Sequence, residues 1–366
     1  FLVYWPGKGE IVAQENLHLP QGTEAFYLDE AYAHRKLVRA FEDRCELWAY
    51  LPVQTPVYDF HELYRGLLDR GREAMTYRLV DRAGDLLVLR SDITLFLARQ
   101  MGLVLEEADL PVRVYYGDTI LRHEDPYDIS RNEFFQVGAE LIGVTGLAAD
   151  AEVMLLLFDA LDHWDQDDVV VHVGHRALLR EYNESGELAP AVARRDWRAA
   201  RELLERQHVS ADQIDALIRL YRFIGSPEEL SETIEALPAL GTDERATLNH
   251  LLSLADEIAA LGYGERLRID LSEVGSQTYH SGVVFQAYAP DLAAPIASGG
   301  RYDGLLARFG SDAPSVGFSV MLRRLQSRTG SGGHPTPQIE RASGTSFRER
   351  VREARRLRDQ GKVTIL

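Results

Sequence analysis

The chain has 366 residues, of which 45% are hydrophobic and 27% charged, a composition typical of a folded protein and unlike that of disordered or fibrous chains. Its 57 acidic and 40 basic residues give a formal net charge of −17, which repels polyanions, so nucleic acid is not the expected partner. The single cysteine, Cys45, excludes an internal disulfide and a multi-cysteine metal site, and it favours a reducing, cytoplasmic compartment. No apolar run reaches the roughly 20 residues of a membrane helix, so no membrane partner is expected. Because the chain starts at Phe1 without a Met, we expect the native N-terminus to be missing.

The first half of the chain predicts helices and strands in alternation. Apolar residues recur at helical spacing from 29 to 48, which predicts an amphipathic helix. Two prolines then favour an extended segment over 51–56. Asp92 and Asp150 each stand where a helix N-cap is expected, because each lies shortly before an apolar run. Strands are predicted over 77–82 and 86–89, which a tight turn joins, and over 112–116, 134–142 and 169–173, with further helices over 95–101 and 152–161.

The middle of the chain predicts a helical insertion. From 176 to 264, Leu, Ala, Glu and Arg recur at helical spacing with glycine interruptions. Strand-like segments then return at 267–271, 282–288 and 295–297, so the β part is split around the helical block. This order predicts an α+β fold in which helices flank an antiparallel sheet. The expected units are the first part of the core (1–175), the insertion (176–264), the second part of the core (265–327), and a linker with a C-terminal helix (328–366).

The C-terminal segment differs from the acidic remainder of the chain. Gly, Pro, Ser and Thr over 329–337 predict a linker, and an arginine-rich helix is predicted over 346–359 before a short β-like end at 363–366. Six arginines outnumber three acids in this helix. It is a docking element, the remnant of a lost domain, or a solvated surface helix.

A first group of candidate functional residues follows the strand predicted over 112–116. Leu121-Arg122-His123-Glu124 comes before a return strand in which Gln136, Gly138 and Glu140 share one face, because side chains alternate along a strand. Arg122 can hold an anionic group bidentately, while Gln136 and Glu140 suit a polar or cationic group. The same pattern also fits a salt-bridged sheet face without any function.

Two further motifs lie in the second part of the predicted core. Gly299 and Gly300 follow a predicted strand and allow close backbone approach, while Arg324 lies on the helix after a later strand, where it can meet a triphosphate or simply face solvent. His280, in an aromatic and polar turn before a strand, can contact a ligand. A lone histidine beside an aromatic residue is more often simply packed.

Taken together and in order, these segments resemble the catalytic domain of class II histidyl-tRNA synthetases over residues 15–327. The first motif of that family resembles 19–56, the second 121–143, and the third 299–325. The resemblance implies a class II aminoacyl-tRNA synthetase-like sheet with a histidine pocket. Its Asp, Thr and Gln would face the ammonium group, its Arg the carboxylate, and its Glu the imidazole. The implied histidine-binding residues are Asp92, Thr94, Arg122, Gln136, Glu140, Tyr279 and His280.

The sequence departs from the synthetases where they perform catalysis. They carry the run Arg-Gly-Leu-Asp-Tyr-Tyr, whose arginine neutralises charge during adenylate formation, and this chain has Gly275-Ser-Gln-Thr-Tyr-His280. Losing a positive charge aimed at a transition state typically costs orders of magnitude in rate. Asn132-Glu133-Phe134 replaces Arg-Glu-Phe, and Met321-Leu-Arg-Arg324 replaces Gly-Leu-Glu-Arg. Synthetases also continue into an anticodon-binding domain, for which the residues after Leu325 leave no room, so no tRNA partner is expected.

This combination resembles the synthetase paralogues that serve as regulatory subunits of ATP phosphoribosyltransferase. The resemblance implies a subunit with no catalytic residues, cofactor or metal of its own. It implies a homodimer, formed through the helix at 29–48 with its apolar Phe41 and Leu47, within a hetero-octamer that contains a short catalytic subunit. Histidine would be the feedback effector. One alternative is a histidyl-tRNA synthetase fragment or free-standing histidine-adenylating ligase, and another is a scaffold whose pocket binds nothing. The enzyme alternative is favoured by the retained Arg122, Glu124, Gln136, Glu140 and Arg324.

Overall fold

The computed structural model of the protein describes residues 22–23, 25–68, 70–123, 132–238, 240–275, 277–329 and 339–365. Some of the expectations above lie outside these residues. They concern the start of the first motif at 19–21, Glu124 of the second motif, and the linker at 330–337.

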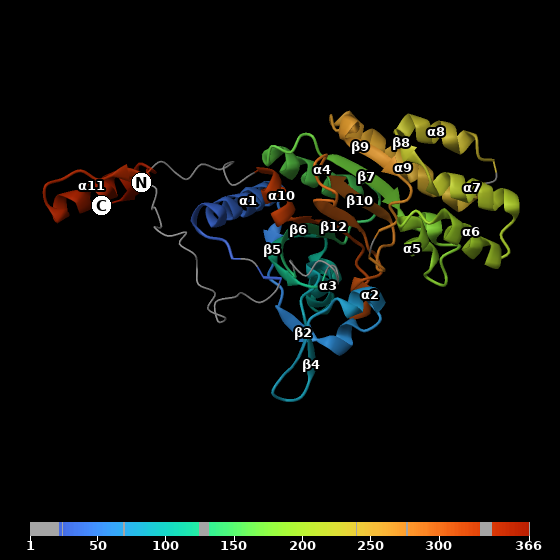
Figure 1. Ribbon diagram of the computed structural model, residues 1–366, viewed down its shortest axis with the longest axis horizontal. Helices are drawn as coiled ribbons and strands as arrows, with labels where there is room; N and C mark the ends of the chain where they lie inside the picture. Colours follow the sequence, from blue (N-terminus) through green and yellow to red (C-terminus); the bar gives the residue numbers. More distant parts are fainter. Residues whose placement is uncertain are drawn as a thin grey trace, which may run out of the picture.

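A nine-stranded sheet forms the centre of the molecule (Figure 1). Neighbouring strands are antiparallel except for the pairs β1–β5 and β7–β9, which are parallel, so the predicted antiparallel sheet is mixed near both ends. Its strands, in spatial order, are β1 (Leu51–Pro52), β5 (Val112–Leu121), β6 (Glu133–Ile142), β12 (Ser315–Met321), β11 (Ala297–Arg301), β10 (Val283–Tyr288), β7 (Val170–His175), β9 (Leu267–Asp270) and β8 (Ile224–Gly225).

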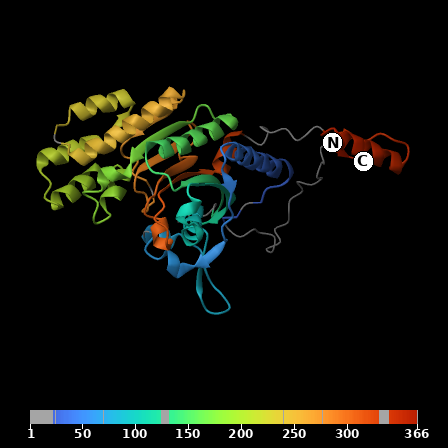
Figure 2. The same cartoon turned by 180° about the vertical axis from the view of Figure 1, so that it is seen from behind.

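The two faces of this sheet bury different residues, because side chains alternate along each strand. Val137 and Ala139 of β6 belong to a large apolar core beneath three helices, whereas Gln136 and Glu140 face the other side, as predicted. The helices over the large core are α1 (Leu28–Leu47), α4 (Leu147–His163) and α9 (Thr242–Ala260). Figure 2 shows these helices and α3 (Ile93–Val104) on opposite sides of the sheet.

A smaller apolar core lies on the α3 side of the sheet. Leu97 and Ala98 of α3 pack there with Tyr64, Tyr116 and Leu306. A three-stranded sheet borders this core, and its hairpin was predicted. The elements here are β2 (Tyr58–Phe60), β3 (Arg78–Val80), β4 (Leu86–Leu89), the short helix α2 (Arg70–Ala74) and the 3-10 turns η1 (His61–Tyr64), η2 (Glu107–Asp109) and η5 (Leu306–Phe309).

Along the chain, a block of helices connects β7 to β9, where the sequence predicts the insertion. Its last helix, α9, packs back against α4, β7 and β9, which joins the block to the sheet. Strand β8 also belongs to this block and pairs with β9, which helical periodicity did not predict. The other elements are η3 (Arg176–Leu179), α5 (Leu188–Ala193), α6 (Trp197–Arg206), α7 (Ala211–Tyr221), α8 (Pro227–Glu235) and η4 (Gly264–Arg266).

The C-terminal part of the chain consists of one helix packed on the main body and a small unit that follows it. After β12, α10 (Leu322–Thr329) packs against α1 and β6. Strands β13 (Glu340–Arg341) and β14 (Thr364–Ile365) then pair in parallel, and α11 (Phe347–Asp359) connects them. Ser346 caps α11, accepting a hydrogen bond from the backbone N–H of Glu349, so the arginine-rich helix predicted from the sequence is present. Among the helices that the structure describes, none is long and apolar enough to cross a membrane.

Three expectations about individual residues are wrong. Helix α4 begins after Gly146, and Asp150 lies buried inside its first turn. Its carboxylate points inward because it accepts a hydrogen bond from Arg301. Phe41 is fully buried, with its ring stacked 5.7 Å from that of Trp164, so it is not available on the outer face of α1. Gly299 and Gly300 lie within β11 and not after a strand, because the sheet pairing continues through them.

Candidate functional site

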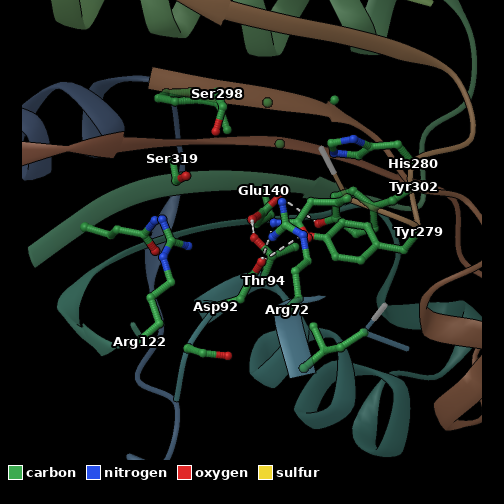
Figure 3. A pocket seen from close by; sticks show the side chains of 18 of the residues that line it. Arg72, Asp92, Thr94, Arg122, Glu140, Tyr279, His280, Ser298, Tyr302 and Ser319 are labelled. Atoms are coloured by element: carbon green, nitrogen blue, oxygen red, sulfur yellow. Dashed lines mark hydrogen bonds between the residues drawn. The ribbon is translucent and has the colours of Figure 1, made fainter. Parts of the chain in front are cut away.

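A cavity of about 360 Å³ opens on the α3 side of the sheet (Figure 3). Its floor is formed by β6, β11 and β12, and its walls by α2, the first turn of α3 and the loop at 277–280. Residues from distant parts of the sequence therefore meet around one space. Every residue of the predicted pocket lines it, namely Asp92, Thr94, Arg122, Gln136, Glu140, Tyr279 and His280.

Glu140 lies at the floor of this cavity with 1% of its surface exposed. Its Oε1 accepts a hydrogen bond from the Thr94 hydroxyl at 2.8 Å, and its Oε2 accepts one from the Tyr302 hydroxyl at 2.6 Å. Burial raises the pKa of Glu140 to about 8, although these hydroxyls favour the charged form. At neutral pH the floor is therefore mostly an uncharged carboxyl group, able both to donate and to accept a hydrogen bond.

The space for this carboxyl group depends on Gly317. Gly317 lies opposite Glu140 in the pairing of β12 with β6. A Cβ atom added at Gly317 would collide with Oε2 of Glu140. Any other residue at this position would push the carboxyl group out of the floor.

Asp92 connects the first turn of α3 to the loop at 277–280. Its Oδ1 accepts from the backbone N–H of Leu95 at 3.2 Å, so the predicted N-cap is confirmed. Its Oδ2 accepts from the Tyr279 hydroxyl at 3.1 Å and from Nε2 of Gln277 at 2.9 Å. The capping carboxylate thus also holds one wall of the cavity in place.

His280 closes that wall next to Tyr279, with the two ring centroids 5.2 Å apart. Burial lowers the pKa of His280 to about 3, so its ring is neutral. Within the described part of the chain, Nδ1 of His280 has no hydrogen-bond partner. Gly275 has φ +76°, and a Cβ atom there would collide with this Nδ1. The ring of His280 therefore has its space only because residue 275 is a glycine.

Two arginines bring positive charge to the cavity. Arg122, just after β5, pairs through its backbone with Thr76 and places its guanidinium 5.6 Å from the centre of the Phe134 ring. Arg72 enters from α2. With Asp92 and Glu140, the walls carry acidic and basic groups within the space of one small molecule.

Sequence reasoning missed several residues of this cavity. Tyr302 lies within the third motif, but its contact with Glu140 depends on the pairing of β11 with β12. Arg72 lies on a five-residue helix with no periodic pattern to draw attention to it. Arg324 does not line the cavity in the described residues, and its Nη1 donates to the carbonyl oxygen of Pro295 at 2.6 Å.

Comparison with known proteins gives consistent results in sequence and structure. The family model described as histidyl-tRNA synthetase matches residues 22–325. An ATP phosphoribosyltransferase regulatory subunit from Moorella thermoacetica is 31% identical over 96% of this chain and 92% of its own length. One from Symbiobacterium thermophilum is 33% identical over 84% of this chain and 78% of its own.

Solved structures show the same relationship. A crystal structure of an ATP phosphoribosyltransferase regulatory subunit/histidyl-tRNA synthetase from Bacillus halodurans has a TM-score of 0.81 and 26% identity, covering 96% of this chain and 92% of its own. Histidyl-tRNA synthetase from Nostoc sp. PCC 7120 has a TM-score of 0.77 and 21% identity, covering 96% and 85%, and it shares the fold.

Proposed function

The chain belongs to the histidyl-tRNA synthetase family and, within it, to the ATP phosphoribosyltransferase regulatory subunits, and from this premise we propose that its cavity binds free histidine as a feedback signal. In this proposal the chain is a non-catalytic subunit in the first step of histidine biosynthesis. It works in the cytoplasm, as a homodimer within a hetero-octamer that also contains a short-form catalytic subunit. It does not bind tRNA.

The observation that carries the proposal is the set of charged residues that line one small cavity. The buried carboxyl group of Glu140 lies there together with a second acidic residue, Asp92, and two arginines. Free histidine presents an imidazole, an ammonium group and a carboxylate. Glu140 can accept a hydrogen bond from the imidazole N–H, and Asp92, with Thr94 and Gln136, suits the ammonium group. Arg122 suits the carboxylate as a bidentate donor. Tyr279 and His280 close the far side.

We also propose that the chain does not adenylate histidine. Synthetases carry an arginine where this chain has Gly275, and any side chain at 275 meets His280. This position therefore supplies no positive charge to a developing transition state, and such a loss typically costs orders of magnitude in rate.

The second candidate function is a histidine-adenylating ligase, favoured by Arg122 and Gln136, which remain in the cavity beside Glu140. Histidine-dependent exchange of pyrophosphate into ATP separates the two candidates. We expect no exchange above background, and clear turnover would make the chain an enzyme.

For feedback, histidine must bind the inhibited assembly more tightly than the active one, because only a difference in affinity shifts an equilibrium. We expect Glu140→Ala and Arg122→Ala to raise both the Kd of histidine and its inhibition constant in the complex with the catalytic subunit. Removing Glu140 leaves an imidazole donor unpaired, which costs about 1–3 kcal/mol, or roughly tenfold to a hundredfold in affinity. Calorimetry measures the first quantity and the inhibited assay the second.

Glu133→Ala provides the matched control, because Glu133 is the exposed first residue of the same strand, β6. Both quantities should keep their wild-type values in this variant. If Glu140→Ala and Arg122→Ala also leave both unchanged, the effector binds somewhere other than this cavity.

A further inference from the structure

One wall of the cavity is built from three segments tied together by hydrogen bonds. The Thr278 hydroxyl donates to the carbonyl oxygen of Leu67 at 2.7 Å, which fastens the loop at 277–280 to the segment before α2. The Tyr279 hydroxyl in turn donates to Asp92 at the start of α3. The segment before α2 and Asp92, the N-cap of α3, therefore both contact the loop at 277–280.

Arg72 of α2 lies on this wall. Its positive charge acts on both rings of the loop: it opposes the rise in the pKa of Tyr279 and adds to the lowering of the pKa of His280, both of which are caused mainly by burial. Figure 3 shows Arg72 directed into the cavity toward Glu140, with Arg122 on the flank away from Tyr279 and His280. The two arginines thus approach the cavity from different sides.

The chemistry of an amino acid decides where a cation that binds its carboxylate must lie. The ammonium and carboxylate groups of an α-amino acid are attached to one carbon, so the acid that binds one and the cation that binds the other must be close neighbours. The acid proposed for the ammonium group is Asp92, whose hydrogen-bond partner Tyr279 lines the same cavity as Arg72. A guanidinium group also matches a carboxylate in a bidentate geometry.

We infer that Arg72 binds the carboxylate of an amino-acid ligand whose ammonium group is held by Asp92, so that α2 recognises the zwitterion. This inference rests on the proposed binding of histidine and adds a residue to that site. Arg72 acts together with Arg122, which approaches the same carboxylate from the other flank. In this arrangement the imidazole is bound by Glu140 and the carboxylate by the arginines.

The test compares histidine with histidinol, in which an alcohol replaces the carboxylate. We expect Arg72→Gln in the full chain to weaken histidine binding about tenfold to a hundredfold, the loss typical of a charged hydrogen bond, and to leave histidinol binding unchanged in calorimetry. Arg72→Lys should recover part of the loss, because it keeps the charge without the bidentate geometry. The control is Arg82→Gln, an exposed arginine of the neighbouring β3–β4 hairpin, which should bind both ligands like the wild type.

The results distinguish this inference from the proposed function. If the wild-type protein binds histidine and Arg72→Gln binds it equally well, the assignment of Arg72 is overturned. If Arg72→Gln weakens histidine and histidinol to the same extent, Arg72 shapes the wall without reading the carboxylate, and the assignment is again overturned. If the wild-type protein binds no histidine, the proposed function itself fails.

Discussion

At the scale of single residues, Glu140 is in an environment far from that of an exposed carboxyl group. Three hydroxyls surround it, from Thr94, Tyr302 and Tyr116, the last at 3.4 Å. Its pKa is about 8, against an ordinary value of 4.5. This difference links the stability of the protein to pH.

Between pH 4.5 and pH 8 the folded protein holds a proton on Glu140 that the unfolded chain has released, so the free energy of unfolding falls as pH rises through this window. The stabilising contribution is fully present below pH 4.5 and is lost as pH approaches the folded-state pKa. A shift of this size corresponds to a free-energy change on the order of 5 kcal/mol. Glu140→Gln removes this dependence, so we expect its stability relative to the wild type to rise from pH 5 to pH 8.

Urea unfolding at several pH values measures this relative stability. Glu133→Gln, at the exposed start of the same strand, should follow the wild-type pH profile. Parallel profiles for Glu140→Gln and the wild type would contradict a proton held at the floor of the cavity.

The cavity residues differ in how far the sequence predicts them. The alternation along β6 places Gln136 and Glu140 on one face, and Asp92 is recognisable as a helix cap. Arg72 and Tyr302 reach the cavity through tertiary contacts, and no local pattern reveals these. The protonation state of Glu140 also cannot be predicted from the sequence, because burial in the folded chain raises its pKa.

At the scale of elements, a buried ion pair joins α4, β11 and α9. Oδ1 of Asp150 accepts from Nε of Arg301 at 2.8 Å, and Oδ2 lies 2.9 Å from Nε2 of His250. Asp150 is 1% exposed and Arg301 6%. Because Arg301 precedes Tyr302, this network connects the floor of the cavity to the helical block.

We expect Asp150→Ala to lower the free energy of unfolding by about 3 kcal/mol, because it removes the buried carboxylate that faces Arg301 and leaves only the more exposed Asp303 as its partner. The matched control is Glu202→Ala, which breaks the solvent-exposed pair with Arg198 on α6 and should cost far less. Chemical denaturation measures both losses. Equal and small losses would show that Arg301 is satisfied without Asp150.

Periodicity predicted most of the helices and strands, because long amphipathic segments carry that signal on their own. It failed where tertiary pairing defines the element. Strand β8 has two residues and exists through its pairing with β9. Gly299 and Gly300 look like turn residues, yet the strands on either side hold them in β11. Asp150 looks like a cap, but the ion pair with Arg301 holds it inside α4.

At the scale of the whole molecule, one end of α1 and the edge strand β1 expose apolar side chains. Leu47 is 73% exposed and Leu51 is 68% exposed. Strand β1 pairs on one side with β5 and ends the sheet. A homodimer formed through this surface would cover both leucines.

We expect the wild-type chain to be a homodimer and Leu47→Glu/Leu51→Glu to be a monomer, because two charges at an apolar interface oppose its burial. Light scattering at micromolar concentration measures the mass. Leu103→Glu is the control, because Leu103 on α3 has a similar exposure of 62% and lies away from this surface. A wild-type monomer, or a double variant that remains dimeric, would rule out dimerisation through α1 and β1.

Gly275 and His280 also limit how this cavity can evolve. An arginine at 275 would require a residue with a side chain to adopt φ +76° and would run into the His280 ring, so that change alone is unfavourable. Replacing His280 first removes that collision but leaves Cγ1 of Val284 2.9 Å from the new Cβ atom, and it leaves the strained backbone. The two positions are therefore epistatic, and a lineage that acquires this pair loses its short mutational route back to an arginine at that point of the wall.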